Sequence, residues 1–396
     1  MQREILAAIF GTILLAVRAA AQASPESTIP PDAEIRKILA ERIDTSHQGV
    51  GIVVGVIDAQ GRRVVSYGRL DQGDARPLNG DTIFEIGSVT KVFTSLLLAD
   101  MVQRGEVALS DPVAKYLTAD VRVPERGGRV ITLVDLSTHT SGLPRLPSNL
   151  QPKDPSNPYA DYTVEQLYQF LSTYQLTRDI GAQFEYSNLG GGLLGLVLAR
   201  RAGTDYEALV HSRITGPLGM SSTAITLTPE MKARFAPGHN DKLVTVPNWD
   251  LPTLAGAGAL RSSVNDLLIF LAANLGYVKS PLAPAMAAML SVRRPTGAPR
   301  TGEVGLAWLI SKPAEEEIVW HNGGTGGYRS FMGYDAKTRA GVVVLSNTFT
   351  NAGVDDIGMH LLDTHVPLLP PPKEHKEIAV DPKLFDGYVG QSFGLL

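Results

Sequence analysis

Alternating or β-branched apolar positions cluster near the two ends of the chain. Residues 50–58 and 62–67 show this pattern on either side of Ala59-Gln60-Gly61, which is typical of a β-hairpin. The second cluster predicts four strands closer to the other end, at 305–310, 317–321, 328–334 and 341–347. The chain therefore carries two groups of strands that lie far apart in sequence.

Between the two groups, apolar residues recur with helical spacing, interrupted by loops rich in glycine and proline. The clearest helices are predicted at 92–104, 163–173, 193–201 and 263–274. Two more are predicted outside this region, at 33–43 and about 354–362. Strands at both ends with helices between them predict one sheet built from both termini beside a helical region, an α/β chain of the α+β type.

The first residues have the pattern of a targeting signal. Arg3 precedes an apolar run from Ile5 to Val17, and Ala21-Gln22-Ala23 stands before Ser24. This is the order of a secretory signal peptide with its small-residue cleavage site. The run is too short for a comfortable membrane span, and no later stretch is long and apolar enough for one. We therefore expect a signal peptide at 1–23 and a secreted or periplasmic protein without a stable membrane span.

Composition narrows the chemistry. With 396 residues, 44% of them hydrophobic and 19% charged, the chain is an ordinary globular protein. Its formal net charge of −4 gives no basic field, so nucleic acid is not an expected partner. The absence of cysteine excludes thiol nucleophiles and metal–thiolate sites, and the histidines show no metal-ligand spacing. Covalent catalysis would depend on Ser, Thr, Lys, Asp, Glu, Tyr or His. The oligomeric state stays open.

Ser88-Val89-Thr90-Lys91 follows Gly87 at the start of a predicted helix. Residues three apart lie on one helix face, so the Lys91 amine can reach the Ser88 hydroxyl. Burial would disfavour the charged form of the lysine and make a neutral amine available to accept the serine proton. The alternative is a solvent-facing serine cap with an unrelated lysine, because Ser-x-x-Lys alone is a weak signal.

Tyr186-Ser187-Asn188 lies in a predicted loop before Gly190-Gly191-Gly192. Residues i and i+2 of an extended segment point the same way, so a phenol and a carboxamide would face one site. The phenol could move a proton, and the amide could hydrogen-bond an acyl-amide substrate. The alternative is a loop tyrosine that packs its ring and leaves its hydroxyl in water.

Trp320-His321-Asn322-Gly323-Gly324 ends a predicted strand and opens a glycine-rich run. Gly323 and Gly324 would let a ligand approach the strand backbone closely. The run lacks the Gly-Lys-Ser/Thr ending of a phosphate loop, which argues against a nucleotide site.

Another histidine, His139, lies at a predicted helix exit and is expected to have a local capping role.

Together and in this order, the three elements resemble those of the penicillin-recognising serine hydrolases: class C β-lactamases, D-alanyl-D-alanine peptidases and their esterase relatives. That superfamily carries Ser-x-x-Lys, Tyr-x-Asn and then Lys-Thr-Gly or His-x-Gly. The stretches Thr138–Pro144, Gly216–Met220 and Gly256–Leu260 are also similar to family sequences. The likeness runs from about Ile52 to Leu362. It implies an antiparallel sheet flanked by helices, an all-helical region, and a site between the two.

The resemblance also implies a role for each motif. Ser88 would be the acyl-forming nucleophile, Lys91 its proton acceptor or electrostatic aid, and Tyr186 a general base or proton relay. Whether Lys91 or Tyr186 takes the serine proton stays open. Asn188 would bind the substrate amide, and the backbone N–H groups of Ser88 and Gly324 would form the oxyanion hole. No cofactor is implied.

Two departures from class C β-lactamases concern the substrate carboxylate. His321 stands where those enzymes usually have a lysine, and a histidine is mostly neutral at pH 7. Val354-Asp355-Asp356 stands where they usually have an arginine at the start of the final helix. Both changes weaken recognition of an anionic β-lactam, and Arg329 would compensate if its side chain points inward.

We therefore expect a hydrolase domain at 24–367, with its sheet from about 49–87 and 301–363 and its helical region at about 88–300, followed by a linker and tail at 368–396. The favoured hypothesis is an exported serine hydrolase that acts on β-lactam or D-alanyl peptide amide bonds. The alternatives are a family VIII-type carboxylesterase that acts on small esters and a non-catalytic penicillin-binding sensor domain. In each case the partner is a small molecule.

Overall fold

The computed structural model describes residues 27–298, 301–313 and 316–371. The predicted signal peptide at 1–23 and residues 372–396 of the predicted tail lie outside the described residues. None of the helices formed by the described residues has the length and apolarity of a membrane span.

The largest element is an antiparallel sheet of eight strands in the order β2-β1-β14-β13-β12-β11-β10-β9. The predicted hairpin forms β1 (Gly51–Asp58) and β2 (Gly61–Gly68). β1 also pairs with β14 (Ala340–Ser346), which joins the two groups of strands. The remaining strands are β13 (Arg329–Asp335), β12 (Ile318–Gly324), β11 (Leu309–Ser311), β10 (Glu303–Val304) and β9 (Arg294–Pro295). The predicted sheet built from both ends of the chain is confirmed.

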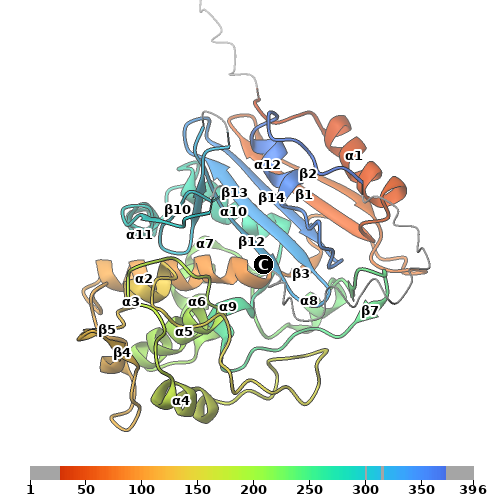
Figure 1. Ribbon diagram of the computed structural model, residues 1–396. Helices are drawn as coiled ribbons and strands as arrows, with labels where there is room; N and C mark the ends of the chain where they lie inside the picture. Colours follow the sequence, from red (N-terminus) through yellow and green to blue (C-terminus); the bar gives the residue numbers. More distant parts are fainter. Residues whose placement is uncertain (1–26, 299–300, 314–315, 372–396) are drawn as a thin grey trace, which may run out of the picture.

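Both faces of the sheet are covered. β1 and β14 are buried along their whole length, as expected for apolar runs in the middle of a sheet with layers on both sides. α1 (Asp32–Ala40) and α12 (Asp355–Leu362) pack on one face (Figure 1). α10 (Val264–Asn274) packs on the other, which faces the helical region.

α2 (Thr90–Gln103) runs through the helical region, and all its residues from Thr90 to Met101 are buried. Its apolar residues surround the helix, which is typical of a core helix. α5 (Asn188–Ala202) and α9 (Ala255–Gly258) pack against it. The other helices are α3 (Leu133–Ser137), α4 (Val164–Thr173), α6 (Tyr206–Val210), α7 (Gly216–Leu218), α8 (Pro229–Ala233) and α11 (Ala283–Ala288). Short strands pair as β3 (Ile83–Glu85) with β8 (Arg261–Ser263), β4 (Glu125–Arg126) with β5 (Arg129–Val130), and β6 (Gly238–His239) with β7 (Thr245–Val246).

α5 begins at Asn188, earlier than the predicted start at 193. The Ser187 side chain accepts a hydrogen bond from the Gly190 N–H at 2.8 Å, and this cap turns the predicted loop into a helix start. Gly190, Gly191 and Gly192, which the sequence predicts as the helix entry, lie in the first turns of the helix, where they allow close packing. A Cβ on Gly191 would lie 3.0 Å from Lys91 Cε. Glycine has a low helix propensity, but a larger residue at this position would crowd the lysine side chain.

The predicted strand at 305–310 is interrupted. Ala307 has a φ of 62°, which breaks the extended backbone and delays β11 to Leu309. The predicted boundaries of the sheet differ from the structure at two short strands. β3 lies within the segment 49–87 that was predicted to join the sheet, but it pairs with β8 in a separate two-stranded sheet. β9 lies within the segment 88–300 that was predicted to be helical, but it is a strand of the large sheet. Strands of two or three residues hold too little pattern to reveal their partners.

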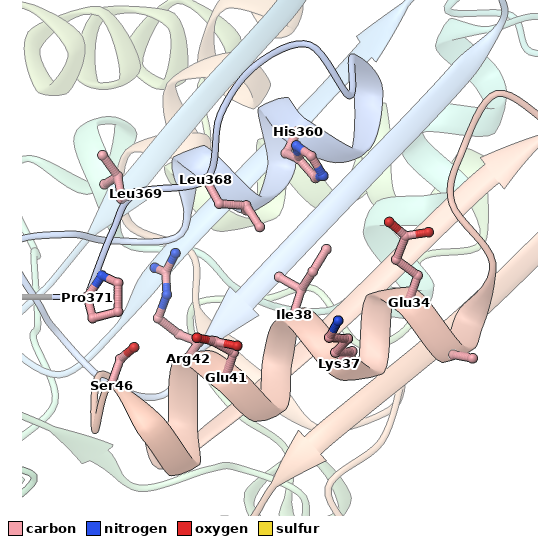
Figure 2. Close-up of a pocket in the computed structure, with 11 residues that line it drawn as sticks. Glu34, Lys37, Ile38, Glu41, Arg42, Ser46, His360, Leu368, Leu369 and Pro371 are labelled. Carbon is pink, nitrogen blue, oxygen red and sulfur yellow. The ribbon is translucent and has the colours of Figure 1, made fainter.

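A buried ion pair ties the helical turn after α1 to α12. The Arg42 guanidinium contacts the Asp356 carboxylate and donates a hydrogen bond to the Gly353 carbonyl at 3.0 Å. Arg42 and Asp356 are 5% and 8% exposed. Arg42 also lines a cavity of about 610 Å³ between α1 and α12, on the sheet face away from the helical region (Figure 2).

We expect Arg42→Ala to lower the free energy of unfolding by about 3 kcal/mol, because it leaves the Asp356 carboxylate buried without its cation. Arg36→Ala, at an exposed arginine of α1, is the matched control and should change this free energy by less than about 0.5 kcal/mol. Urea unfolding followed by circular dichroism measures both. Equal effects of the two variants would contradict a stabilising role for the ion pair.

Candidate active site

The turn that carries Ser88 lies between the sheet and the helical region. Residues Gly87–Val89 form one 3₁₀ turn directly before α2. Gly87 has a φ of 48°, and a Cβ there would lie 2.7 Å from the Gly324 nitrogen at the end of β12. Glycine tolerates both this conformation and this close approach. The turn can therefore pack directly against the strand that carries the third motif.

All three sequence motifs meet at one cavity of about 640 Å³. The predicted site residues that line it are Ser88, Tyr186, Asn188, Gly323, Gly324 and Arg329. Lys91 is buried next to the cavity and touches Ser88. His321 is also buried and is not among the lining residues.

Lys91 is held by oxygen atoms from three segments of the chain. Its Nζ lies 3.0 Å from Ser88 Oγ, 2.8 Å from Asn188 Oδ1 and 2.7 Å from the Ala257 carbonyl oxygen. Burial, with a smaller contribution from the charge of Arg145, lowers the pKa of Lys91 well below its usual value. A neutral amine has two N–H donors, and the amide and carbonyl oxygens, which can only accept, use both. In the neutral form the lone pair is left for the Ser88 hydroxyl, from which it can accept the proton.

Tyr186 is a neutral phenol in this site. Burial raises its pKa above the usual value, and a side-chain hydrogen bond with Ser88 opposes only part of that rise. Lys91 Nζ lies 4.8 Å from the centre of the Tyr186 ring, and the Arg145 guanidinium lies 5.2 Å from it. A protonated hydroxyl beside Ser88 can donate a hydrogen bond or pass on a proton. Burial therefore disfavours the phenolate of Tyr186 and the ammonium form of Lys91.

The end of β12 lies directly against the Ser88 backbone. A Cβ on Gly323 would lie 2.1 Å from the Ile86 carbonyl oxygen and 2.9 Å from the Ser88 nitrogen. A hollow of about 20 Å³ borders Ser88 and Gly324. This volume is sufficient for one group the size of a water molecule.

His321 shares the β12 face of Val319, which packs toward the helical region. Its Nδ1 lies 2.6 Å from the Asn322 carbonyl oxygen, so Nδ1 carries the proton and Nε2 does not. Burial, followed by the charge that Lys91 carries when protonated, lowers the pKa of His321 to about 3. His321 is therefore neutral at pH 7, as expected from the sequence.

Among the described residues that line the cavity, the charged side chains are two arginines. The Arg329 side chain points inward, the orientation in which it can compensate for the missing cations. It donates from Nε to the Thr350 carbonyl at 2.9 Å, and its guanidinium lies 4.1 Å from the centre of the Phe349 ring. Arg145 comes from the loop after α3, and no carboxylate of the described chain pairs with it. The cavity is therefore positively charged.

Arg145 and two aromatic residues of the wall were not predicted from the sequence. Tyr159 and Trp249 line the cavity with their ring centres 5.5 Å apart, and Tyr159 Oη lies 3.4 Å from Asn188 Nδ2. All three come from irregular loops, where no periodic pattern marks a residue as inward-facing. The one available signal was the position of Arg145 directly after the family-like stretch ending at Pro144.

Asp355 lies at the start of α12 near Arg329. Its Oδ2 accepts a hydrogen bond from Asn322 Nδ2 at 2.5 Å. Burial raises the pKa of Asp355 to about 6, although the Asn322 bond and the charge of Arg329 act in the opposite direction. Near neutral pH its carboxylate offsets part of the positive charge of Arg329.

No three His, Asp or Glu side chains in the described ranges are grouped as metal ligands. The expectation that the chemistry uses no cofactor stays a prediction.

The chain is similar to known proteins along most of its length. The family model named Beta-lactamase matches residues 33–364. The D-alanyl-D-alanine-carboxypeptidase/endopeptidase AmpH of Escherichia coli strain K12 is 30% identical over 359 residues, which cover 87% of this chain and 91% of that protein. A β-lactamase/D-alanine carboxypeptidase from Yersinia pestis shares the fold, with 27% identity, a TM-score of 0.70, and coverage of 80% of this chain and 92% of that one. So does a class C β-lactamase from Rhodobacter sphaeroides, with 25% identity, a TM-score of 0.71, and coverage of 85% and 99%.

Asp355→Asn should stabilise the protein above pH 6 and have little effect at pH 4. The pKa of Asp355 is about 6 in the fold and about 4 in an unfolded chain, so the folded state loses stability as the pH rises through this window. Two pKa units correspond to about 3 kcal/mol, and the lost interaction of a carboxylate with the α12 N-terminus offsets part of that gain. We expect a net gain of about 2 kcal/mol at pH 7 in urea unfolding. A gain that is constant from pH 4 to pH 8 would contradict this origin.

Proposed function

The chain belongs to the β-lactamase family, and we propose that it is an exported serine hydrolase that forms an acyl-enzyme on Ser88 and opens β-lactam or D-alanyl peptide amide bonds. The signal-peptide pattern at 1–23 supports export. The observation that carries the mechanism is the buried Lys91 amine, whose Nζ lies 3.0 Å from Ser88 Oγ and has two further oxygen partners.

In the proposed acylation step, Ser88 Oγ bonds to the carbonyl carbon of the substrate while its proton passes to Lys91 Nζ. The tetrahedral intermediate then collapses and its carbon–nitrogen bond breaks. The leaving nitrogen takes the Tyr186 hydroxyl proton, and the Lys91 ammonium returns a proton to Tyr186. The raised pKa of Tyr186 and the lowered pKa of Lys91 support this division of roles.

Deacylation uses the same groups. A water molecule attacks the acyl carbon and gives a proton to the neutral Lys91, which returns it to Ser88 Oγ as the ester bond breaks. The negative oxygen of each intermediate would occupy the small hollow beside Ser88 and Gly324, where the two backbone N–H groups would stabilise it. Asn188, already bound to Lys91, would present its Nδ2 to the substrate amide.

The charge of the cavity supports an anionic substrate. Arg145 and Arg329 lie on its walls, and an arginine is a strong partner for a carboxylate. β-Lactams and D-alanyl peptides carry a carboxylate, whereas small neutral esters do not. The relative named D-alanyl-D-alanine-carboxypeptidase/endopeptidase AmpH supports the same substrate class. The neutral His321 and the acidic Asp355 favour the esterase alternative, but neither removes the two arginines.

The proposal is tested by an intact-mass spectrum after brief exposure of the chain to benzylpenicillin, with the drug analysed from the same sample. We expect either a penicilloyl adduct that maps to Ser88 or unmodified protein with hydrolysed penicillin. Ser88→Ala should give neither. Turnover by the Ser88→Ala variant would refute the mechanism.

The outcomes also separate the alternatives. Hydrolysed penicillin indicates a β-lactamase. A persistent adduct with release of D-alanine from a D-Ala-D-Ala peptide indicates a peptidase, and the adduct without that release indicates the sensor domain. Intact penicillin, unmodified protein and cleavage of p-nitrophenyl butyrate would contradict our proposal and support the esterase.

Arg145→Gln combined with Arg329→Gln should lower kcat/KM for benzylpenicillin at least tenfold more than kcat/KM for neutral p-nitrophenyl butyrate. The reason is that two cations able to bind the substrate carboxylate are lost. Arg122→Gln, at an exposed arginine outside the cavity, is the matched control. Steady-state kinetics on both substrates provides the measurement. Equal losses on the anionic and the neutral substrate would show that the arginines do not select for charge.

A further inference from the structure

His139 occupies an unusual backbone position close to the site. It follows α3 by two residues, and its φ of 56° lies in the left-handed region, which few residues other than glycine adopt. The side chain is only 3% exposed. The expected local capping role is wrong for this side chain, because its Nδ1 accepts a hydrogen bond from the distant Ser187 N–H at 3.1 Å.

The contacts of His139 enclose Tyr186 from both sides along the chain. The His139 carbonyl oxygen accepts a hydrogen bond from the Glu185 N–H at 2.8 Å, and its Nδ1 accepts the Ser187 N–H. The imidazole ring packs on the Tyr186 ring, with the ring centres 4.5 Å apart and the planes 30° apart. One residue therefore holds the backbone before Tyr186, the backbone after it, and the phenol ring between them.

We propose that His139 is a positioning residue that fixes the Tyr186 hydroxyl at Ser88 by holding both neighbouring backbone N–H groups and stacking on the phenol ring. The inference rests on the proposed function, in which Tyr186 passes a proton to the leaving nitrogen. Proton transfer requires the hydroxyl within hydrogen-bond reach of its partner, so a small displacement of the ring slows the step.

The hydrogen bonds fix the tautomer of His139. Because Nδ1 accepts the Ser187 N–H, the single proton of the neutral ring is on Nε2. Protonation of Nδ1 would break that bond. The titratable or charged groups around the ring are Tyr186, Lys91, His321 and Arg145. Burial and the charges of the last three lower the pKa of His139 well below its usual value. His139 therefore acts through geometry and not as an acid or base.

Asn188 does not depend on His139 in the same way. Its backbone N–H donates to the Arg145 carbonyl at 3.0 Å, and its Oδ1 accepts from Lys91. Loss of the His139 contacts should therefore displace Tyr186 more than the amide that binds substrate. This difference predicts a defect in the chemical step with little loss of substrate binding.

Two substitutions separate the contacts. His139→Phe keeps a ring on Tyr186 and removes the acceptor for Ser187, whereas His139→Asn keeps a side-chain acceptor near the same place and tolerates a positive φ. The probes are p-nitrophenyl acetate, by its nitrophenolate burst, and benzylpenicillin, by quenching and intact mass. Leu209→Ala, a core truncation in α6, is the control for a general loss of stability. Acylation of wild-type Ser88 in the same experiment tests the proposed function separately.

We expect His139→Phe to slow acylation 10- to 100-fold, while the probe concentration that gives half the maximal acylation rate stays within threefold of wild type. His139→Asn should be at least fivefold faster than His139→Phe, and Leu209→Ala should acylate at the wild-type rate per folded molecule. In a Tyr186→Phe background, His139→Phe should have no further effect, because its target is already gone. If His139→Phe does not fold, His139→Ala replaces it in this cycle. The proposal would be overturned if the effects of the two substitutions multiply in the double variant or if His139→Phe acylates at the wild-type rate. It would also be overturned if His139→Asn is no faster than His139→Phe.

Discussion

The burial of the Lys91 amine is the constraint on which the site depends. An amine removed from water needs acceptors for its N–H groups, and two of them come from Asn188 in α5 and Ala257 in α9. These helices can reach the lysine because they approach each other at Gly195 and Gly256, where a Cβ on either would lie 2.8 Å from the opposite Cα. Close helix packing therefore buries the amine and lowers its pKa, which favours the neutral form that can accept the Ser88 proton.

The positive charge at the cavity does not come from the two positions where class C β-lactamases usually carry a cation. His321 is neutral and Asp355 is acidic, whereas Arg329 on β13 and Arg145 in a loop line the cavity. A cation at position 321 would stand near Lys91 and would lower the pKa of its amine further. With a neutral histidine there, burial and the charge of Arg145 lower that pKa. Arg145 and Arg329 therefore supply the positive charge that can attract a carboxylate.

Elements with a long repeating pattern were predictable from the sequence, and those that depend on a distant partner were not. The hairpin, the strands β12 to β14 and the core helix α2 all bury many residues in a regular order. The start of α5 was predicted too late, because the Ser187 cap and the glycines that leave space around Lys91 extend the helix back to Asn188. His139 was misassigned because its hydrogen-bond partner lies 48 residues away.

The sequence by itself determined the family, the sheet built from both chain ends, and the motifs of the candidate site. These features follow from the order and spacing of residues along the chain, which can be read directly from the sequence. Only the tertiary structure decided the lowered pKa of Lys91, the neutral state of Tyr186, the inward direction of Arg329, and the presence of Arg145 and His139 at the site. Burial and charge depend on which distant segments surround a side chain, and that is settled when the helical region packs against the sheet.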